Sequence, residues 1–239
     1  MTKKAIVVLS GGLDSSTCAY IAQKDDGYNV HALSFYYGQR HKVELESAKK
    51  IARVLGIEHT ILELPKPMNN ALTEDIDVPF DRTLENMSKE IPITYVPCRN
   101  TVFIALALQL AEQIDAEAIY TGINAIDYSS YPDTRPEYAE AWQKLINLAT
   151  KKTIEGGKIV LKNPLQHLYK AEIIEWGTKL GLDYGLTHSC YKGSVPPCLE
   201  CDSDQLRIKG FIEAGLRDPL IDEKIWNKIQ KIDNRYRVL

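Results

Sequence analysis

Short runs of apolar and β-branched residues alternate along the chain with longer segments in which apolar residues recur at helical spacing. This pattern predicts strands at 5–9, 30–35, 60–64, 118–121 and 158–161. It predicts helices at 17–23, 43–55, 101–114, 136–150 and 168–180. Alternating strands and helices form parallel sheets with right-handed crossovers and helices on both faces. The predicted fold is therefore α/β, with a doubly wound parallel five-stranded sheet.

Two regions depart from this rhythm. Residues 65–97 contain five prolines and many polar positions, and we expect them to cross the active-site face as a long excursion. The region after the last predicted helix carries a cluster of cysteines and indicates a small C-terminal metal-binding appendage. We therefore expect a nucleotide-binding domain over residues 1–154 and a C-terminal extension over 155–239, packed on the same core.

The composition is that of an ordinary globular enzyme, with 239 residues, 44% of them hydrophobic and 26% charged. No apolar run approaches the roughly 18 residues of a membrane helix, and the N-terminus leads straight into a strand. We therefore expect a cytoplasmic protein without a membrane partner. The net charge of −3 argues against a broad electrostatic contact with nucleic acid and favours a small-molecule substrate.

The most informative segment, Ser-Gly-Gly-Leu-Asp-Ser-Ser, directly follows the first predicted strand. Two glycines allow a tight turn, so that backbone N–H groups and the hydroxyls of Ser10, Ser15 and Ser16 can converge on one phosphate-sized anion. The helix that follows adds its dipole. The segment lacks the lysine of the familiar Gly-x-x-x-x-Gly-Lys-Ser/Thr nucleotide loop. It carries Asp14 instead, and a carboxylate beside a phosphate site suits a Mg²⁺ bound between the two. The alternative is a tight turn without a ligand.

Three further residues are candidates for the same site. Arg99 begins a predicted helix and offers phosphates a planar, bidentate fork. Gly122 follows the fourth strand, where ligands of parallel sheets bind. Lys170 also begins a helix, where its charge opposes the helix dipole, which favours a phosphate-neutralising function. The ordinary alternatives are a solvated charge for each basic residue and a plain turn for the glycine.

Residues 128–136 combine aromatic, hydroxyl, carboxylate and guanidinium groups, which suits a flat hydrogen-bonding heterocycle. Tyr131 would stack on the ring, Asp133 would accept from its N–H groups, and Arg135 would pair with a carboxylate or phosphate. Together with Asp127, they form the predicted substrate-binding set. A merely solvated loop is the alternative.

Cys190, Cys198 and Cys201 lie close together in sequence, and in a cytosolic chain such a cluster indicates a metal site before a disulfide. Asp204 follows Cys201 with two residues between them, and the family resemblance described below implies that its carboxylate completes a tetrahedral site for a structural Zn²⁺. His188 is the alternative fourth ligand, although it is close to Cys190 for chelation, and a metal-free loop is a further alternative. The isolated Cys18 and Cys98 are expected to be core residues, and the alternative for Cys98 is a thiol whose pKa is lowered by a helix N-terminus.

The loop after the first strand resembles that of the PP-loop ATP pyrophosphatase superfamily. From residue 4 to about 217, the chain resembles the 7-cyano-7-deazaguanine synthase family of the queuosine pathway, in segments 9–19, 35–41, 96–101, 122–136, 170–173 and 189–193. The resemblance implies conversion of 7-carboxy-7-deazaguanine to the nitrile with ATP and ammonia, a structural zinc and a homodimer. It implies catalytic functions for Asp14, Arg99 and Lys170. It implies ATP contacts from Leu9, Ser10, Gly11, Gly12, Leu13, Asp14, Ser15, Ser16, Thr17, Cys18, Ala19 and Gly122. The family's loop usually holds four cysteines, and Asp204 stands where the fourth would be.

Other functions remain open from the sequence. A tRNA lysidine synthetase or thiolase would share the loop, but it should add a basic face or reactive cysteines near the nucleotide. A nucleotide-binding module without chemistry would keep the loop and release no AMP. A variant of the family could pass the same activated acid to another amine, such as a protein N-terminus.

Overall fold

The computed structural model describes residues 2–39, 42–66, 95–126 and 131–239. Five parallel strands form one sheet in the order β3-β2-β1-β4-β5. Their bounds are β1 Lys4–Val8, β2 Asn29–Tyr36, β3 Glu58–Glu63, β4 Ala118–Tyr120 and β5 Val160–Lys162. This confirms the predicted five-stranded parallel sheet. Most of the predicted excursion between 65 and 97 lies outside the described residues.

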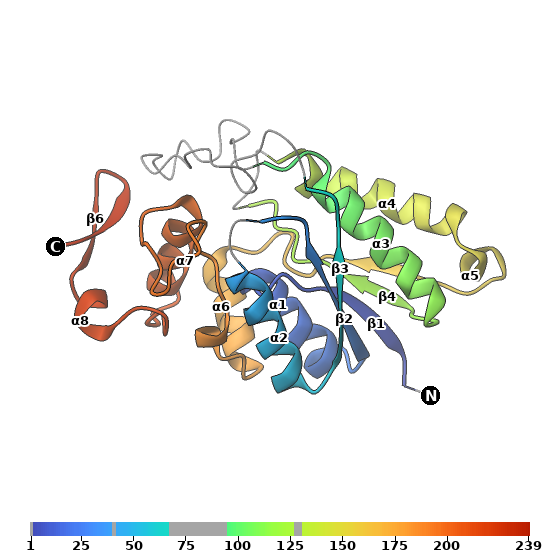
Figure 1. Cartoon of the computed structure of the whole chain (residues 1–239), viewed down its shortest axis with the longest axis horizontal. Coiled ribbons are helices and arrows are strands. Elements are labelled where there is room, and N and C mark those ends of the chain that lie inside the picture. The colour runs from blue at the N-terminus through green and yellow to red at the C-terminus, as the bar shows by residue number, and fades with distance from the viewer. Residues whose placement is uncertain (1, 40–41, 67–94, 127–130) are drawn as a thin grey trace.

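Helices cover both faces of the sheet (Figure 1). On one face lie α1 (Leu13–Tyr20), α2 (Val43–Leu55) and α6 (Lys170–Lys179), and on the other lie α3 (Arg99–Gln113) and α4 (Pro136–Ala149). A π-helical turn, Ile21–Asp25 (η1), extends α1, and a short helix α5 (Lys151–Ile154) follows α4. The arrangement is the doubly wound one that the alternating pattern predicts.

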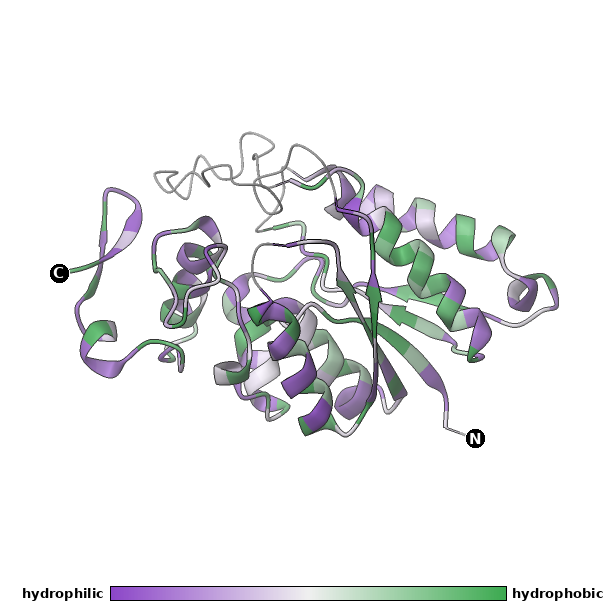
Figure 2. Cartoon of the chain, viewed as in Figure 1, coloured by the Kyte–Doolittle hydropathy of each residue, from purple (hydrophilic) through white to green (hydrophobic). Residues whose placement is uncertain are grey.

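The central strand shows why this sequence forms a two-sided sheet. Ala5 and Val7 of β1 pack in the core beneath α1 and α6, whereas Ile6 packs in the core beneath α3 and α4. All three are fully buried. A parallel strand covered on both faces needs a continuous apolar run rather than an alternating one. The interior strands are accordingly green along most of their length in Figure 2.

The first helix begins earlier than the sequence indicates. It starts at Leu13 rather than Thr17, because Gly12 adopts the extended N-cap conformation and the Thr17 hydroxyl donates to the Leu13 carbonyl at 2.9 Å. Asp14, Ser15 and Ser16 therefore lie in the first helical turn and not in a preceding loop. Their position places the first N–H groups of α1, which have no acceptor four residues earlier, at the end of β1.

The C-terminal region contains elements that apolar periodicity did not predict. These are α7 (Asp202–Glu213), α8 (Glu223–Trp226) and an antiparallel hairpin of β6 (Ile229–Ile232) and β7 (Arg235–Val238). They lie beyond α6, away from the sheet (Figure 1). β5 lies beyond residue 154 and pairs with β4, so the sheet extends past the expected domain boundary. The division of the chain into two domains stays a prediction.

A buried ion pair anchors α7. The guanidinium of Arg207 contacts the carboxylate of Asp218 at 2.6 and 2.9 Å and donates to the Thr187 hydroxyl at 2.8 Å. The side chains of Arg207 and Asp218 are 3% and 1% exposed. Removing one partner would leave a buried charge without compensation.

We therefore expect Asp218→Ala to lower the free energy of unfolding by about 3 kcal/mol or more. The matched control is Glu213→Gln, which removes the half-exposed Lys209–Glu213 pair on the same helix and should change stability by less than about 0.5 kcal/mol. Urea unfolding followed by circular dichroism measures both. Equally small effects would show that the Arg207 pair is dispensable.

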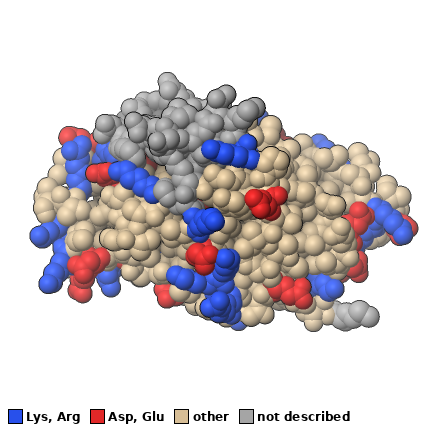
Figure 3. Space-filling model, viewed as in Figure 1, with Lys and Arg blue, Asp and Glu red and all other residues tan. Residues whose placement is uncertain are grey.

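The described part of the chain holds no helix that is both long and apolar enough to span a bilayer. On the face shown in Figure 3, Lys and Arg side chains are interspersed with Asp and Glu. That face therefore presents both signs of charge rather than a broad basic surface.

Candidate active site

A cavity of about 240 Å³ opens at the carboxyl ends of the strands. Residues from the turn after β1, the end of β2, the first turns of α2, α3 and α6, the segment after β4 and the cysteine loop line it. Those used below are Ser10, Gly12, Asp14, Ser15, Phe35, Tyr37, Glu44, Arg99, Phe103, Gly122, Asn124, Tyr131, Lys170, His188, Ser189 and Tyr191. Segments distant in sequence thus meet where ligands of parallel sheets bind.

The turn after β1 is held in one conformation by its own hydroxyls. The Ser10 and Ser15 oxygens lie 2.9 Å apart, and the Gly12 N–H donates to the Ser10 hydroxyl at 3.2 Å. Gly11 has φ +89°, and a Cβ there would lie 2.1 Å from the Glu44 carbonyl oxygen. Only glycine allows this close approach to α2. The turn and the start of α1 together offer N–H and hydroxyl groups to an anion.

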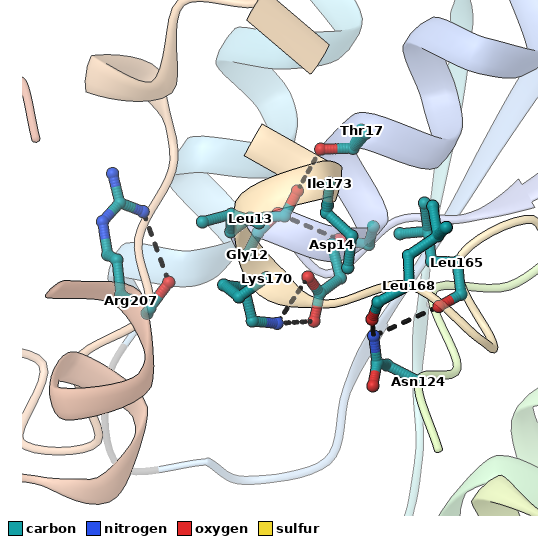
Figure 4. Close-up of polar contacts among 12 residues, drawn as sticks. Gly12, Leu13, Asp14, Thr17, Asn124, Leu165, Leu168, Lys170, Ile173 and Arg207 are labelled. Carbon is teal, nitrogen blue, oxygen red and sulfur yellow. Dashed lines mark hydrogen bonds and ion pairs between the residues drawn. The ribbon is translucent and has the colours of Figure 1, made fainter. Parts of the chain in front are cut away.

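The segment after β4 also approaches this turn closely. A Cβ on Gly122 would lie 2.9 Å from the Ser15 nitrogen. The glycine therefore lets the backbone of this segment pack against the first turn of α1. Beside it, the Asn124 amide donates to the carbonyls of Leu165 and Leu168, at 3.1 and 2.8 Å, which connects this edge to the chain before α6 (Figure 4).

Asp14 and Lys170 form an ion pair at the floor of the cavity (Figure 4). The Lys170 Nζ lies 2.8 and 2.9 Å from the two carboxylate oxygens of Asp14. The Lys170 side chain is only 6% exposed, so the pair is largely removed from water. The structure thus brings together two residues that are far apart in sequence, one predicted for Mg²⁺ and the other for phosphate.

Arg99 enters the cavity from the first residue of α3. Burial acts against its charged form, but the neighbouring Tyr37 and Tyr131 raise its pKa, so it remains a cation. Cys98 precedes it with φ 55°. Cys98 is exposed, so the expectation of a core residue was wrong, whereas Cys18 is fully buried as expected.

Glu44 is a lining residue that was not predicted from the sequence. Burial raises its pKa to about 7, although Arg99 favours the ionised form. It lies on α2 four residues before Ala48 and seven before Ile51, both fully buried, so it shares their face of the helix. A carboxylate at the start of an otherwise apolar face is the signal that could have identified it.

Several predicted ATP contacts lie in the interior. Ser16, Cys18 and Ala19 are fully buried, and the Ser16 hydroxyl has no hydrogen-bond partner among the described residues. Thr17 is also buried, with its hydroxyl 2.9 Å from that of Tyr184. These residues support α1 rather than line the cavity, and their predicted contact with ATP stays a prediction.

The predicted substrate-binding set divides in the structure. Tyr131 lines the cavity. Asp133 is 5% exposed and accepts a hydrogen bond from the Asn100 nitrogen at 3.2 Å, which supports the start of α3. Arg135 is exposed and donates to the Pro132 carbonyl. Asp127 lies outside the described residues. Substrate recognition by this set stays a prediction.

The cysteine loop and the start of α7 bring together the four predicted metal ligands. The ligand atoms of Cys190, Cys198, Cys201 and Asp204 all lie within 4.8 Å of one another. Asp204 Oδ2 accepts from the Leu199 N–H at 3.0 Å, and burial raises the pKa of Asp204 to about 7. Its Oδ1 is buried without a hydrogen-bond partner among the described residues.

This donor set fits a metal ion, because three thiols and a carboxylate match the ligands of tetrahedral zinc. A bound cation would also favour the ionised aspartate. His188 lies outside the group, and its Nε2 is 3.3 Å from the Cys190 carbonyl oxygen. His188, Ser189 and Tyr191 line the cavity beside Cys190, so the loop also forms part of the cavity wall.

A doubly wound sheet whose first strand ends in a serine- and glycine-rich turn with an aspartate defines the class of PP-loop ATP pyrophosphatases. Within that class, residues 4–215 match the model of the queuosine biosynthesis protein QueC family, and the chain belongs to this family. A 7-cyano-7-deazaguanine synthase from Desulfatibacillum aliphaticivorans is 54% identical over 91% of this chain and 95% of its own length. The synthase of Citrifermentans bemidjiense is 50% identical over 94% of this chain and 100% of its own. Among solved structures, the U34-tRNA thiolase NcsA from Methanococcus maripaludis is 20% identical, with a TM-score of 0.47 over 78% of this chain and 58% of that one.

Proposed function

We propose that this chain is a 7-cyano-7-deazaguanine synthase, which converts 7-carboxy-7-deazaguanine and ammonia to the nitrile with ATP in queuosine biosynthesis. The observation that carries the proposal is the near-complete match to relatives of that name, at about half identity, together with the cavity at the end of β1. ATP and the carboxylated base are both anionic, which is consistent with a site formed by an anion-binding turn beside buried basic groups.

The chemistry requires activation because a carboxylate repels nucleophiles and hydroxide is a poor leaving group. The substrate carboxylate attacks the α-phosphorus of ATP and pyrophosphate leaves. Ammonia then attacks the acyl carbon, and AMP and a proton leave to give the amide. The amide oxygen attacks a second ATP, pyrophosphate leaves again, and loss of AMP and protons forms the nitrile.

The chain's own residues supply positioning and charge stabilisation in this scheme. The N–H groups of Gly12 and the first turn of α1 bind phosphate oxygens. Lys170 and Arg99 offset negative charge that builds up as pyrophosphate departs. Asp14 would hold Mg²⁺, which supplies electrophilic assistance at the phosphates when bound.

We assign the cysteine loop to one structural Zn²⁺ with Asp204 as the fourth ligand. Four protein ligands leave no open position, so no step of the reaction uses this site. The enzyme is proposed to act in the cytoplasm, without direct contact to nucleic acid or membrane. We also propose that the protein is a homodimer.

Turnover of the purified protein tests the proposal. With 7-carboxy-7-deazaguanine, ATP, Mg²⁺ and ammonium as the sole nitrogen source, we expect AMP and pyrophosphate release that depends on the acid, and a nitrile product by mass spectrometry. Binding of ATP without release of AMP would favour a nucleotide-binding module. Adenylation without nitrile formation, restored by a peptide amine, would favour the variant acceptor.

A further inference from the structure

We propose that Glu44 recognises the 2-amino and ring N–H edge of the deazaguanine. This inference rests on the substrate class of the proposed function and adds a specificity-determining residue to it. A guanine-type ring presents two N–H donors side by side on this edge, and an ionised carboxylate accepts two parallel hydrogen bonds. The match between carboxylate and paired donors is therefore both chemical and geometric.

The position of Glu44 is fixed by the fold. It belongs to the first turn of α2, whose backbone packs directly on Gly11 of the turn after β1, at a distance that excludes a Cβ. Leu45, Ala48 and Ile51 anchor the same helix in the core. A carboxylate on a packed helix is positioned more tightly than one on a loop, which suits recognition of a rigid ring.

Glu44 is also the carboxylate of this cavity that accepts no hydrogen bond from the described residues, although Arg99 acts on it electrostatically. Of the described residues that line it, two carry carboxylates, Asp14 and Glu44. Lys170 contacts both oxygens of Asp14. No hydrogen bond to the Glu44 carboxylate occurs within the described part of the chain. A partly desolvated acceptor without a donor is costly, and a ligand that supplies two donors offsets that cost. The raised pKa of Glu44 has the same cause, desolvation.

The cavity beside Glu44 has flat aromatic walls. Phe35 and Phe103 stack with centroids 4.1 Å apart, and Tyr37 lies against Phe103 at 5.8 Å. All three line the cavity together with Glu44 and Arg99. Planar walls next to a carboxylate favour an aromatic heterocycle that offers N–H groups in its plane. Adenine offers one amino group beside a ring acceptor, so it matches a carboxylate less well than a guanine-type edge does.

Direct binding tests the proposal without requiring turnover. Calorimetry on the whole protein compares 7-carboxy-7-deazaguanine with its analogue that lacks the 2-amino group. We expect the wild type to bind the parent acid about 10²-fold more tightly than the analogue. Glu44→Gln should weaken the parent by a similar factor and the analogue only a few-fold, because the glutamine NH₂ faces a donor. The discrimination between the two ligands should therefore nearly disappear.

Glu46→Gln is the matched control, since Glu46 lies on the same turn of α2, is exposed and pairs with Lys49. It should leave both affinities unchanged. Glu44→Asp keeps the charge and should retain part of the discrimination, which guards against a variant that simply fails to fold. ATP binding should stay within about threefold in every variant.

Three results would overturn the proposal: equal binding of the two ligands by the wild type, equal weakening of both in Glu44→Gln, or a loss confined to ATP, which would assign Glu44 to adenine. Binding with discrimination but without nitrile formation would instead overturn the proposed function alone. A wild type that binds neither ligand would overturn both.

Discussion

Replacing Asp14 by Asn is expected to lower AMP formation by about 10³-fold or more, while 7-carboxy-7-deazaguanine binding stays within a few-fold. The amide keeps the shape of the side chain but removes the charge that Mg²⁺ would require and that balances Lys170. Single-turnover formation of AMP and pyrophosphate measures the first effect, and calorimetry with the carboxylated base measures the second.

The matched control is Asp115→Asn. Asp115 also pairs with a lysine, Lys152, at 2.6 Å, but it is 85% exposed and distant from the cavity. This variant should keep full activity. Equal loss of AMP formation and base binding in Asp14→Asn would contradict the assignment of Asp14 to the metal and phosphates.

The second large effect concerns the cysteine loop. Protein purified without added zinc is expected to carry close to one zinc per chain, and Asp204→Ala should lose most of it. The alanine variant removes the fourth donor and also the acceptor of the Leu199 N–H, which would leave three thiols at an incomplete tetrahedron. Metal analysis by mass spectrometry measures zinc content directly.

Two further variants separate metal binding from general damage to the loop. Asp204→Cys restores a fourth soft ligand and should retain zinc at least as well as the natural aspartate. His188→Ala should also retain zinc, because His188 lies outside the group of ligand atoms. Metal-free protein that is fully active and as stable as the zinc-loaded form would refute the site.

The sheet and its main helices could be predicted from the sequence because their burial follows simple periodicities. β1 is a continuous apolar run, and α2 places Ala48 and Ile51 at helical spacing on one buried face. The turn after β1 could also be predicted from the sequence, because its glycines indicate a tight turn. In the structure, a Cβ on Gly11 would clash with the Glu44 carbonyl oxygen, so only glycine fits there. The grouping of Cys190, Cys198, Cys201 and Asp204 could be predicted from their spacing and from the family pattern, whereas metal binding by this group stays a prediction.

The helix α7 could not be predicted in this way because it buries polar groups. Asp204, Gln205 and Arg207 are all nearly inaccessible. Segments distant in sequence satisfy two of them, because Gln205 donates to the backbone of Tyr236 and Arg207 pairs with Asp218. The buried face of α7 therefore cannot be identified from a stripe of apolar residues.

The substrate residues were difficult for a related reason. Asp133 has the chemistry of a ligand contact, but its carboxylate supports the backbone of Asn100. Glu44 looks like an ordinary helix-start acid until the cavity is seen. The residue type shows which partners a side chain can bind, but only the fold shows which of these partners it contacts.

In the Asp14–Lys170 pair, each charge compensates the other, so neither side chain is an isolated buried ion in the wall of the cavity. Under the proposed function, Mg²⁺ at Asp14 and phosphate at Lys170 would each compete with this contact. That competition would lower the affinity of the site for nucleotide substrate and product alike. An enzyme that must exchange AMP and pyrophosphate for fresh ATP midway through its reaction, while the base stays bound, benefits from a site that releases its nucleotide as readily as it takes it up.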